Sequence, residues 1–176
     1  MFKKINIDLP SLSASAGDQE IIKYGLDTDT GFEGIKYNDC SPLLSGLQPI
    51  LDKIPAEHRS KFFPLYMTIN RDIIPHIDSG VMTVINIYIE AGGYKTDLNT
   101  PKDGAQPFQI PNQTNGTCYQ FEDVNTVDSY VANNGEIYIL DVSKLHSVHS
   151  GTGTRTAVAL STNIEFNDVV EMFVTN

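Results

Sequence analysis

The sequence predicts a mainly β fold, an antiparallel sandwich or barrel with one helical region in the first third of the chain. Short segments after residue 62 alternate apolar and polar residues with a period of two, which is typical of strands. Turn-forming residues separate these segments, and Asn133-Asn134-Gly135 is the clearest tight turn. The length of 176 residues suits one domain, residues 1–176, and is sufficient for a substantial core.

The helical region is expected between residues 41 and 54. Ser41 and Pro42 predict its start, with a side-chain cap followed by a proline at the first helical position. Pro49 should kink or split the helix, and Pro55 should end it. We expect this region to pack across a sheet and a second, short helix to follow at 167–174. The helical stripe of apolar residues consists of Leu43, Leu44, Leu47, Ile50, Leu51 and Ile54.

The rest of the chain is expected to form strands, of which 81–90 has the most regular alternation. Residues 91–116 contain four glycines and three prolines and predict a long loop with room for one short strand. This loop and residues 122–134 are candidates for a lid over a substrate, because long loops in compact domains are often functional. The expected strands are Phe63–Ile69, Ile73–Asp78, Val81–Glu90, Thr117–Phe121, Thr126–Val131, Glu136–Val142 and Arg155–Ile164.

Composition excludes several classes of function. The chain has 12 basic and 22 acidic residues and a net charge of −10, which disfavours binding to a phosphate backbone. No segment approaches the roughly 18–20 apolar residues of a membrane helix, and the first residues lack the apolar block of a secretory signal. Cys40 and Cys118 show no C-x-x-C spacing, so we expect reduced thiols and a cytoplasmic protein.

The first candidate for chemistry is the pair His76 and Asp78. Their spacing of two places both side chains on one face of a strand. With a histidine from a distant strand they would form the 2-His-1-carboxylate triad that holds non-haem Fe(II) and leaves positions open for substrates. The alternative is a partly buried histidine bonded to a neighbouring carboxylate.

The second candidate is Arg155, which follows His146 by nine residues across a turn with two glycines. Arg155 shares its strand face with the small residues Ala157, Ala159 and Ser161, so it would carry a positive charge into open space inside a barrel. A buried guanidinium needs an anionic partner. Either an internal carboxylate or a dicarboxylate ligand could provide it, and we favour the ligand.

The pattern His76-x-Asp78, His146-x-Val148 and Arg155 resembles the double-stranded β-helix dioxygenases that use Fe(II) and 2-oxoglutarate. The likeness is greatest to the prolyl-hydroxylase-like branch and covers about residues 62–164. It implies a jelly-roll or cupin-like barrel with one or two helices packed against a sheet. It also implies that His76, Asp78 and His146 ligate iron and that Arg155 pairs with the distal carboxylate of 2-oxoglutarate.

The same resemblance suggests further contacts to the cosubstrate. Tyr66 lies ten residues before His76, where such enzymes often place a tyrosine, and Asn86 or Tyr88 could bond the cosubstrate from the following strand. Core packing is the competing interpretation for these residues.

Two histidines remain outside this site. The nine-residue spacing to Arg155 fits His146 and not His149, and an offset of three would place these histidines on opposite faces of a strand. We therefore expect His149 in a turn or at the surface. His58 lies in a polar stretch and is expected to be solvated.

The resemblance implies an oxygenase that couples C–H oxidation to decarboxylation of 2-oxoglutarate to succinate. O2 and 2-oxoglutarate would be its small-molecule partners, and a peptide side chain or a small metabolite its substrate. One alternative is a cupin-like metalloenzyme without 2-oxoglutarate, for which Glu90 is the only candidate extra ligand. The other is a non-catalytic β-sandwich binding module.

Overall fold

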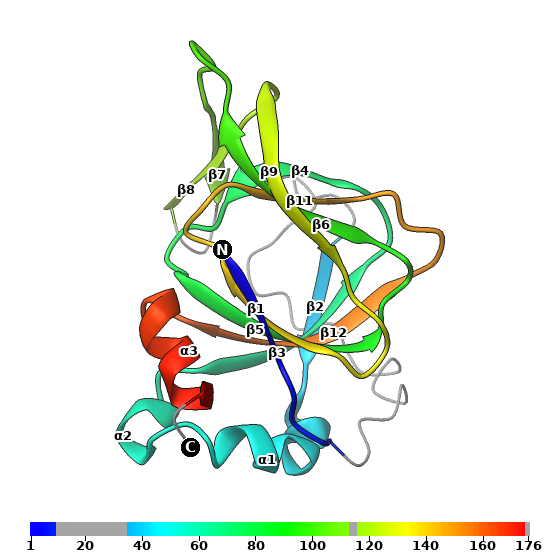
Figure 1. The fold of residues 1–176 in the computed structure, drawn as a ribbon, viewed down its shortest axis with the longest axis vertical. Coiled ribbons are helices and arrows are strands. Elements are labelled where there is room, and N and C mark those ends of the chain that lie inside the picture. Colours follow the sequence, from blue (N-terminus) through cyan, green and yellow to red (C-terminus); the bar gives the residue numbers. More distant parts are fainter. Residues whose placement is uncertain (10–34, 113–115, 175–176) are drawn as a thin grey trace.

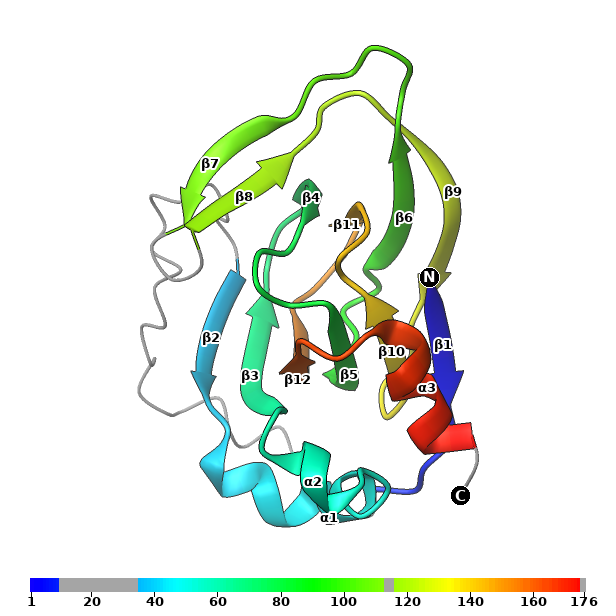
Figure 2. The same ribbon diagram turned by 90° about the vertical axis from the view of Figure 1, so that its left-hand side faces the viewer.

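Two six-stranded antiparallel sheets form the body of the protein in the computed structural model, which describes residues 1–9, 35–112 and 116–174 (Figures 1 and 2). The first sheet has the order β1-β10-β5-β12-β3-β2. Its strands are β1 (Phe2–Ile5), β2 (Ile35–Asp39), β3 (Phe63–Ile69), β5 (Thr83–Glu90), β10 (Ile137–Asp141) and β12 (Arg155–Thr162).

The second sheet has the order β7-β8-β4-β11-β6-β9. From β3 to β6 and again from β9 to β12, the chain changes sheet at every step, which is the winding of a jelly roll. The predicted fold class, a mainly β jelly-roll barrel, is thus confirmed. The strands of this sheet are β4 (Ile73–Ile77), β6 (Lys95–Pro101), β7 (Phe108–Asn112), β8 (Gly116–Gln120), β9 (Val124–Val131) and β11 (His146–His149).

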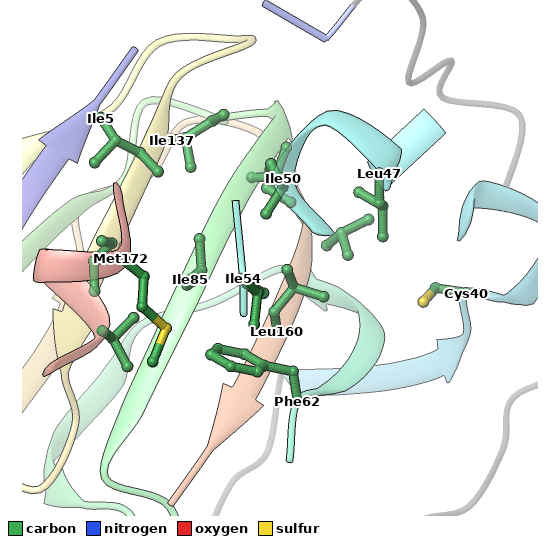
Figure 3. Packing of buried hydrophobic residues seen from close by; sticks show 14 of the residues in the cluster. Ile5, Cys40, Leu47, Ile50, Ile54, Phe62, Ile85, Ile137, Leu160 and Met172 are labelled. Carbon is green, nitrogen blue, oxygen red and sulfur yellow. The ribbon is translucent and has the colours of Figure 1, made fainter. Parts of the chain in front are cut away.

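The helices lie at one end of the molecule against the first sheet, and the β7–β8 hairpin lies at the opposite end (Figures 1 and 2). A buried cluster joins the helices to the sheet: Leu47, Ile50 and Phe62 pack against Ile85 and Leu160 (Figure 3). The helical elements are η3 (Ser41–Leu47, a 3-10 helix), α1 (Gln48–Leu51), α2 (Ala56–Arg59) and α3 (Phe166–Val174).

A second buried cluster fills the barrel between the two sheets. On β12, Ala157 and Ala159 belong to this inner cluster, whereas Val158 and Leu160 belong to the helix-side cluster. Strand alternation therefore gives the first sheet two buried faces. The predicted small inner face of the strand after Arg155 is present.

The helical region differs in detail from the prediction. Pro49 does divide it, since a 3-10 helix precedes it and α1 begins one residue before it. The cap position is Cys40 and not Ser41, and it makes no side-chain capping bond. Cys40 is buried, whereas the side chain of Cys118 lies outside the described part of the chain.

The long loop expected at 91–116 is wrong, because these residues contain β6, β7 and the start of β8. The polar residues of β6 concealed a strand whose seven residues all pair with β9. Residues 122–134 likewise contain β9, so neither segment is the loop that a lid requires. Besides the strands in this expected loop, three others, β1, β2 and β11, were not predicted. No helix within the described ranges is long and apolar enough to cross a membrane.

Candidate metal centre

The structure brings His76, Asp78 and His146 together inside the barrel. His76 of β4 lies directly opposite His146 of β11, and Asp78 follows the end of β4 by one residue. One ligand atom from each of the three residues lies within 4.8 Å of the others. His76 Nε2 is 3.3 Å from Asp78 Oδ1, and the two imidazole rings are 4.3 Å apart between centroids. Within the described ranges, this is the group of side chains that could hold a metal ion.

Backbone carbonyls orient both imidazoles. His76 Nδ1 lies 2.8 Å from the carbonyl oxygen of Ile74, and His146 Nδ1 lies 2.9 Å from that of Lys144. A carbonyl can only accept, so in each ring Nδ1 is the donor of this hydrogen bond and Nε2 is the nitrogen left for a metal ion. Outer hydrogen bonds of this kind fix the tautomer of metal-binding histidines. Both rings are thus prepared to bind a cation through Nε2.

The charge states also suit a metal. Burial, assisted by the nearby charge of His76, lowers the pKa of His146 to about 4, so this ligand is neutral at pH 7. Burial alone would raise the pKa of Asp78, but its hydrogen bond with His76 and the nearby histidine charges hold that pKa below its usual value. Two imidazoles and a carboxylate make a donor set of the 2-His-1-carboxylate type, which can hold a metal ion.

Arg155 is 1% exposed at the start of β12, and its side chain reaches the second sheet. Its Nη1 donates to Thr96 Oγ1 at 3.0 Å, and its Nη2 donates to the carbonyl oxygen of Tyr94 at 2.6 Å. The guanidinium also lies over the rings of Tyr88 and Tyr94, at 5.1 and 5.4 Å from their centroids.

No ion pair among the described residues involves Arg155, and its buried Nε has no hydrogen-bond partner. The internal carboxylate that was the competing interpretation is therefore not found in the part of the chain that the structure describes. Within the described ranges the guanidinium thus has one unpaired N–H donor and no acid beside it, which suits an anionic ligand.

The other two predicted cosubstrate contacts, Asn86 and Tyr66, lie on opposite faces of the first sheet. Asn86 lies on the inner face of β5 between Val84 and Tyr88 and is 7% exposed, and its buried Oδ1 has no hydrogen-bond partner in the described part of the chain. Tyr66 lies opposite Val158 and packs in the helix-side cluster. The alternation of β3 thus turns Tyr66 away from the barrel interior, and Tyr88 is the tyrosine that contacts Arg155.

Several other expectations need correction. His149 ends β11 and is not in a turn, but its side chain is 34% exposed, so the alternative of a surface position holds in part; its Nε2 lies 2.6 Å from Asp97 Oδ2. His58 is half-buried with a buried Nδ1 that has no hydrogen-bond partner, so it is not fully solvated. Glu90 is exposed and is not part of the metal-binding group.

Two residues near the centre were missed in the sequence. Burial, assisted by the nearby charge of Asp78, raises the pKa of Tyr37 of β2. Gln120 of β8 lies directly opposite His76 and is 3% exposed. Neither could have been found, because β2 was not predicted and no sequence pattern pairs β8 with β4.

Comparison with known proteins does not assign this chain to a family. No family model and no curated protein matches the sequence. Among solved structures, vicilin from Corylus avellana (hazelnut) aligns at a TM-score of 0.40 and 14% identity, over 74% of this chain and 29% of that one. Vicilin from Capsicum annuum aligns at a TM-score of 0.40 and 15% identity, over 81% of this chain and 40% of that one. The chain thus spans less than half the length of either vicilin, and the fold assignment rests on the strand order described above.

Proposed function

We propose that this chain is an Fe(II)- and 2-oxoglutarate-dependent oxygenase that hydroxylates a peptide side chain or a small metabolite. The observation that carries the proposal is Arg155, a buried guanidinium with no carboxylate partner among the described residues, in the barrel that also contains the triad. A buried cation without an acid is unfavourable unless a ligand supplies the anion. A dicarboxylate that chelates the metal with one end would supply it with the other.

The residues present fit both groups. His76, Asp78 and His146 would hold the iron and leave positions open, as facial triads do. Bound iron and 2-oxoglutarate would supply oxygen activation coupled to decarboxylation of the cosubstrate to succinate. Arg155 would orient the distal carboxylate, and Thr96 and the Tyr94 carbonyl hold its guanidinium in place. The ring of Tyr88 covers the guanidinium and keeps water away from it.

The test is an anaerobic titration of the Fe(II)-loaded protein with 2-oxoglutarate. We expect a weak charge-transfer band in the visible spectrum that saturates at one equivalent of bound cosubstrate. His76→Ala should lose the band, whereas His58→Ala, outside the triad, should keep it. Iron uptake without a band would favour a cupin-like metalloenzyme that does not use 2-oxoglutarate. No iron uptake at all would favour a non-catalytic binding module.

A further inference from the structure

A single row of paired residues crosses the second sheet and passes through the metal centre. Phe108 of β7 pairs with Gln120 of β8, Gln120 pairs with His76, His76 pairs with His146, and His146 pairs with Leu98 of β6. Residues directly opposite each other in antiparallel strands point to the same face. Leu98 belongs to the inner cluster, so this row faces the interior of the barrel.

Gln120 is the unexplained member of the row. It is 3% exposed, and its amide nitrogen Nε2 is buried without a hydrogen-bond partner among the residues that the structure describes. Its neighbour Tyr119 is 40% exposed, as alternation requires if Gln120 points inward. Because opposite Cβ atoms are about 5 Å apart, the side chains of Gln120 and His76 leave neighbouring strands side by side on the same face of the sheet. A buried N–H group without an acceptor destabilises the folded protein. The unpaired amide of Gln120 therefore points to a ligand that accepts its hydrogen bond.

Phe108 extends the row to the surface. It is 48% exposed on β7, the edge strand of the sheet, in the hairpin at the end of the molecule away from the helices (Figure 2). The row thus runs from an exposed aromatic ring through a buried amide donor to the metal ligands. A molecule lying along it would meet an apolar contact, then one hydrogen-bond donor, then the metal centre.

We propose that Gln120 binds a carbonyl oxygen of the primary substrate and that this substrate is a neutral amide, with an apolar group against Phe108. The donor on Gln120 carries no charge and could not neutralise a carboxylate buried beside it, whereas a neutral carbonyl avoids the cost of burying a charge. The buried cation of the barrel, Arg155, is a separate receptor and suits an anion. The net charge of −10 also disfavours a polyanionic substrate. The role of this subsite in oxidation rests on the proposed function, but amide binding at Gln120 can be tested without it.

The probe is N-acetylglycine N-methylamide, a neutral amide, and N-acetylglycine is its anionic counterpart. In the Mn(II)-loaded protein, paramagnetic relaxation of the probe's methyl protons measures binding near the metal. We expect saturable binding of the neutral amide, about tenfold weaker in Gln120→Met, since one hydrogen bond is lost. Gln106→Met, at an exposed glutamine, is the matched control and should bind the amide as the wild-type protein does.

Two further readouts exclude a purely structural role. Gln120→Met should keep the Mn(II) affinity and unfold at an unchanged or higher temperature, because it removes an unpaired buried donor. A lower unfolding temperature with unchanged amide affinity would show a structural role and overturn the proposal. No binding of the neutral amide to the wild-type protein, or tighter binding of the anionic probe through Gln120, would also overturn it.

Failure of the metal centre is distinguishable from failure of this inference. If Mn(II) does not bind, the proposed function fails, but NMR of the metal-free protein still decides the role of Gln120. Its side-chain amide signal, identified by its disappearance in Gln120→Met, should shift when the neutral amide is added. An unmoved signal would overturn the inference even if the metal centre is intact.

Discussion

Replacing Arg155 by methionine should weaken 2-oxoglutarate binding at least 30-fold and leave metal binding intact. The guanidinium is 1% exposed and has no acidic partner in the described ranges, so a bound carboxylate would be its counter-ion. Removing one partner of a buried, hydrogen-bonded charge pair costs about 2–5 kcal/mol. At about 1.4 kcal/mol per factor of ten, the affinity for 2-oxoglutarate should fall by about 30-fold to several thousand-fold.

Thermal unfolding of the Mn(II)-loaded protein measures this loss. A ligand at 100 times its Kd stabilises the folded state by about 2.7 kcal/mol. For a chain of this size that corresponds to roughly 5–10 °C in Tm. At the same concentration, Arg155→Met should shift by at most about 3 °C, which is what a 30-fold weaker affinity leaves.

Arg59→Met is the matched control, because the side chain of Arg59 is 45% exposed on α2 and should not affect the ligand shift. A full 2-oxoglutarate shift in Arg155→Met would refute the assignment of this guanidinium to the cosubstrate. Loss of the shift caused by Mn(II) alone would show instead that Arg155 supports the metal centre.

Three other substitutions test the remaining parts of the account. In the metal-free protein, His146 alone should lower the unfolding free energy by about 3 kcal/mol as the pH falls from 6.5 to 4. In this range the imidazole binds a proton in the unfolded chain but not in the folded chain. Urea unfolding should show that His146→Gln loses this part of the pH dependence, and an unchanged dependence would contradict it. Gly92→Ala should destabilise the protein by at least 1 kcal/mol more than Gly135→Ala. Both glycines have positive φ, but a Cβ at Gly92 would lie 2.6 Å from the Thr154 carbonyl oxygen, whereas a Cβ at Gly135 would meet no atom within 4 Å. Equal losses of unfolding free energy in the two variants would refute the close packing of this turn on the residue before β12. Tyr66→Phe should leave the 2-oxoglutarate affinity within about twofold, since its ring packs on the helix side of the sheet, and a large loss in a binding titration would return Tyr66 to the site.

The residues of the metal-binding group could be predicted because strand alternation is a local rule. It places His76 and Asp78 on one face whatever their partners are. The same rule predicted that Arg155 would share a face with small alanines, as it does. What the sequence does not contain is the pairing of β4 with β11 that brings His146 opposite His76. The resemblance to known enzymes provided that step.

Two predictions are wrong, the position of Tyr66 near the cosubstrate and the loop at 91–116. Both concern strands that are buried on their two faces. Both faces of the first sheet are buried, so β3 carries apolar residues on both faces and alternation alone could not tell which face Tyr66 would occupy. In β6, the polar residues Asp97 and Asn99 are buried. Both accept a hydrogen bond from Thr126, and Asn99 also donates one to Ser147 of β11. Such a strand lacks the apolar pattern by which strands are recognised, and its composition predicts a loop.

A crystal structure of the protein with Mn(II) and N-oxalylglycine, an unreactive mimic of 2-oxoglutarate, tests the central claim most directly. We predict one ion bound by His76, Asp78 and His146, with the inhibitor chelating it and its distal carboxylate bonded to Arg155. An ion held elsewhere, or an inhibitor whose distal carboxylate does not reach Arg155, would contradict the account.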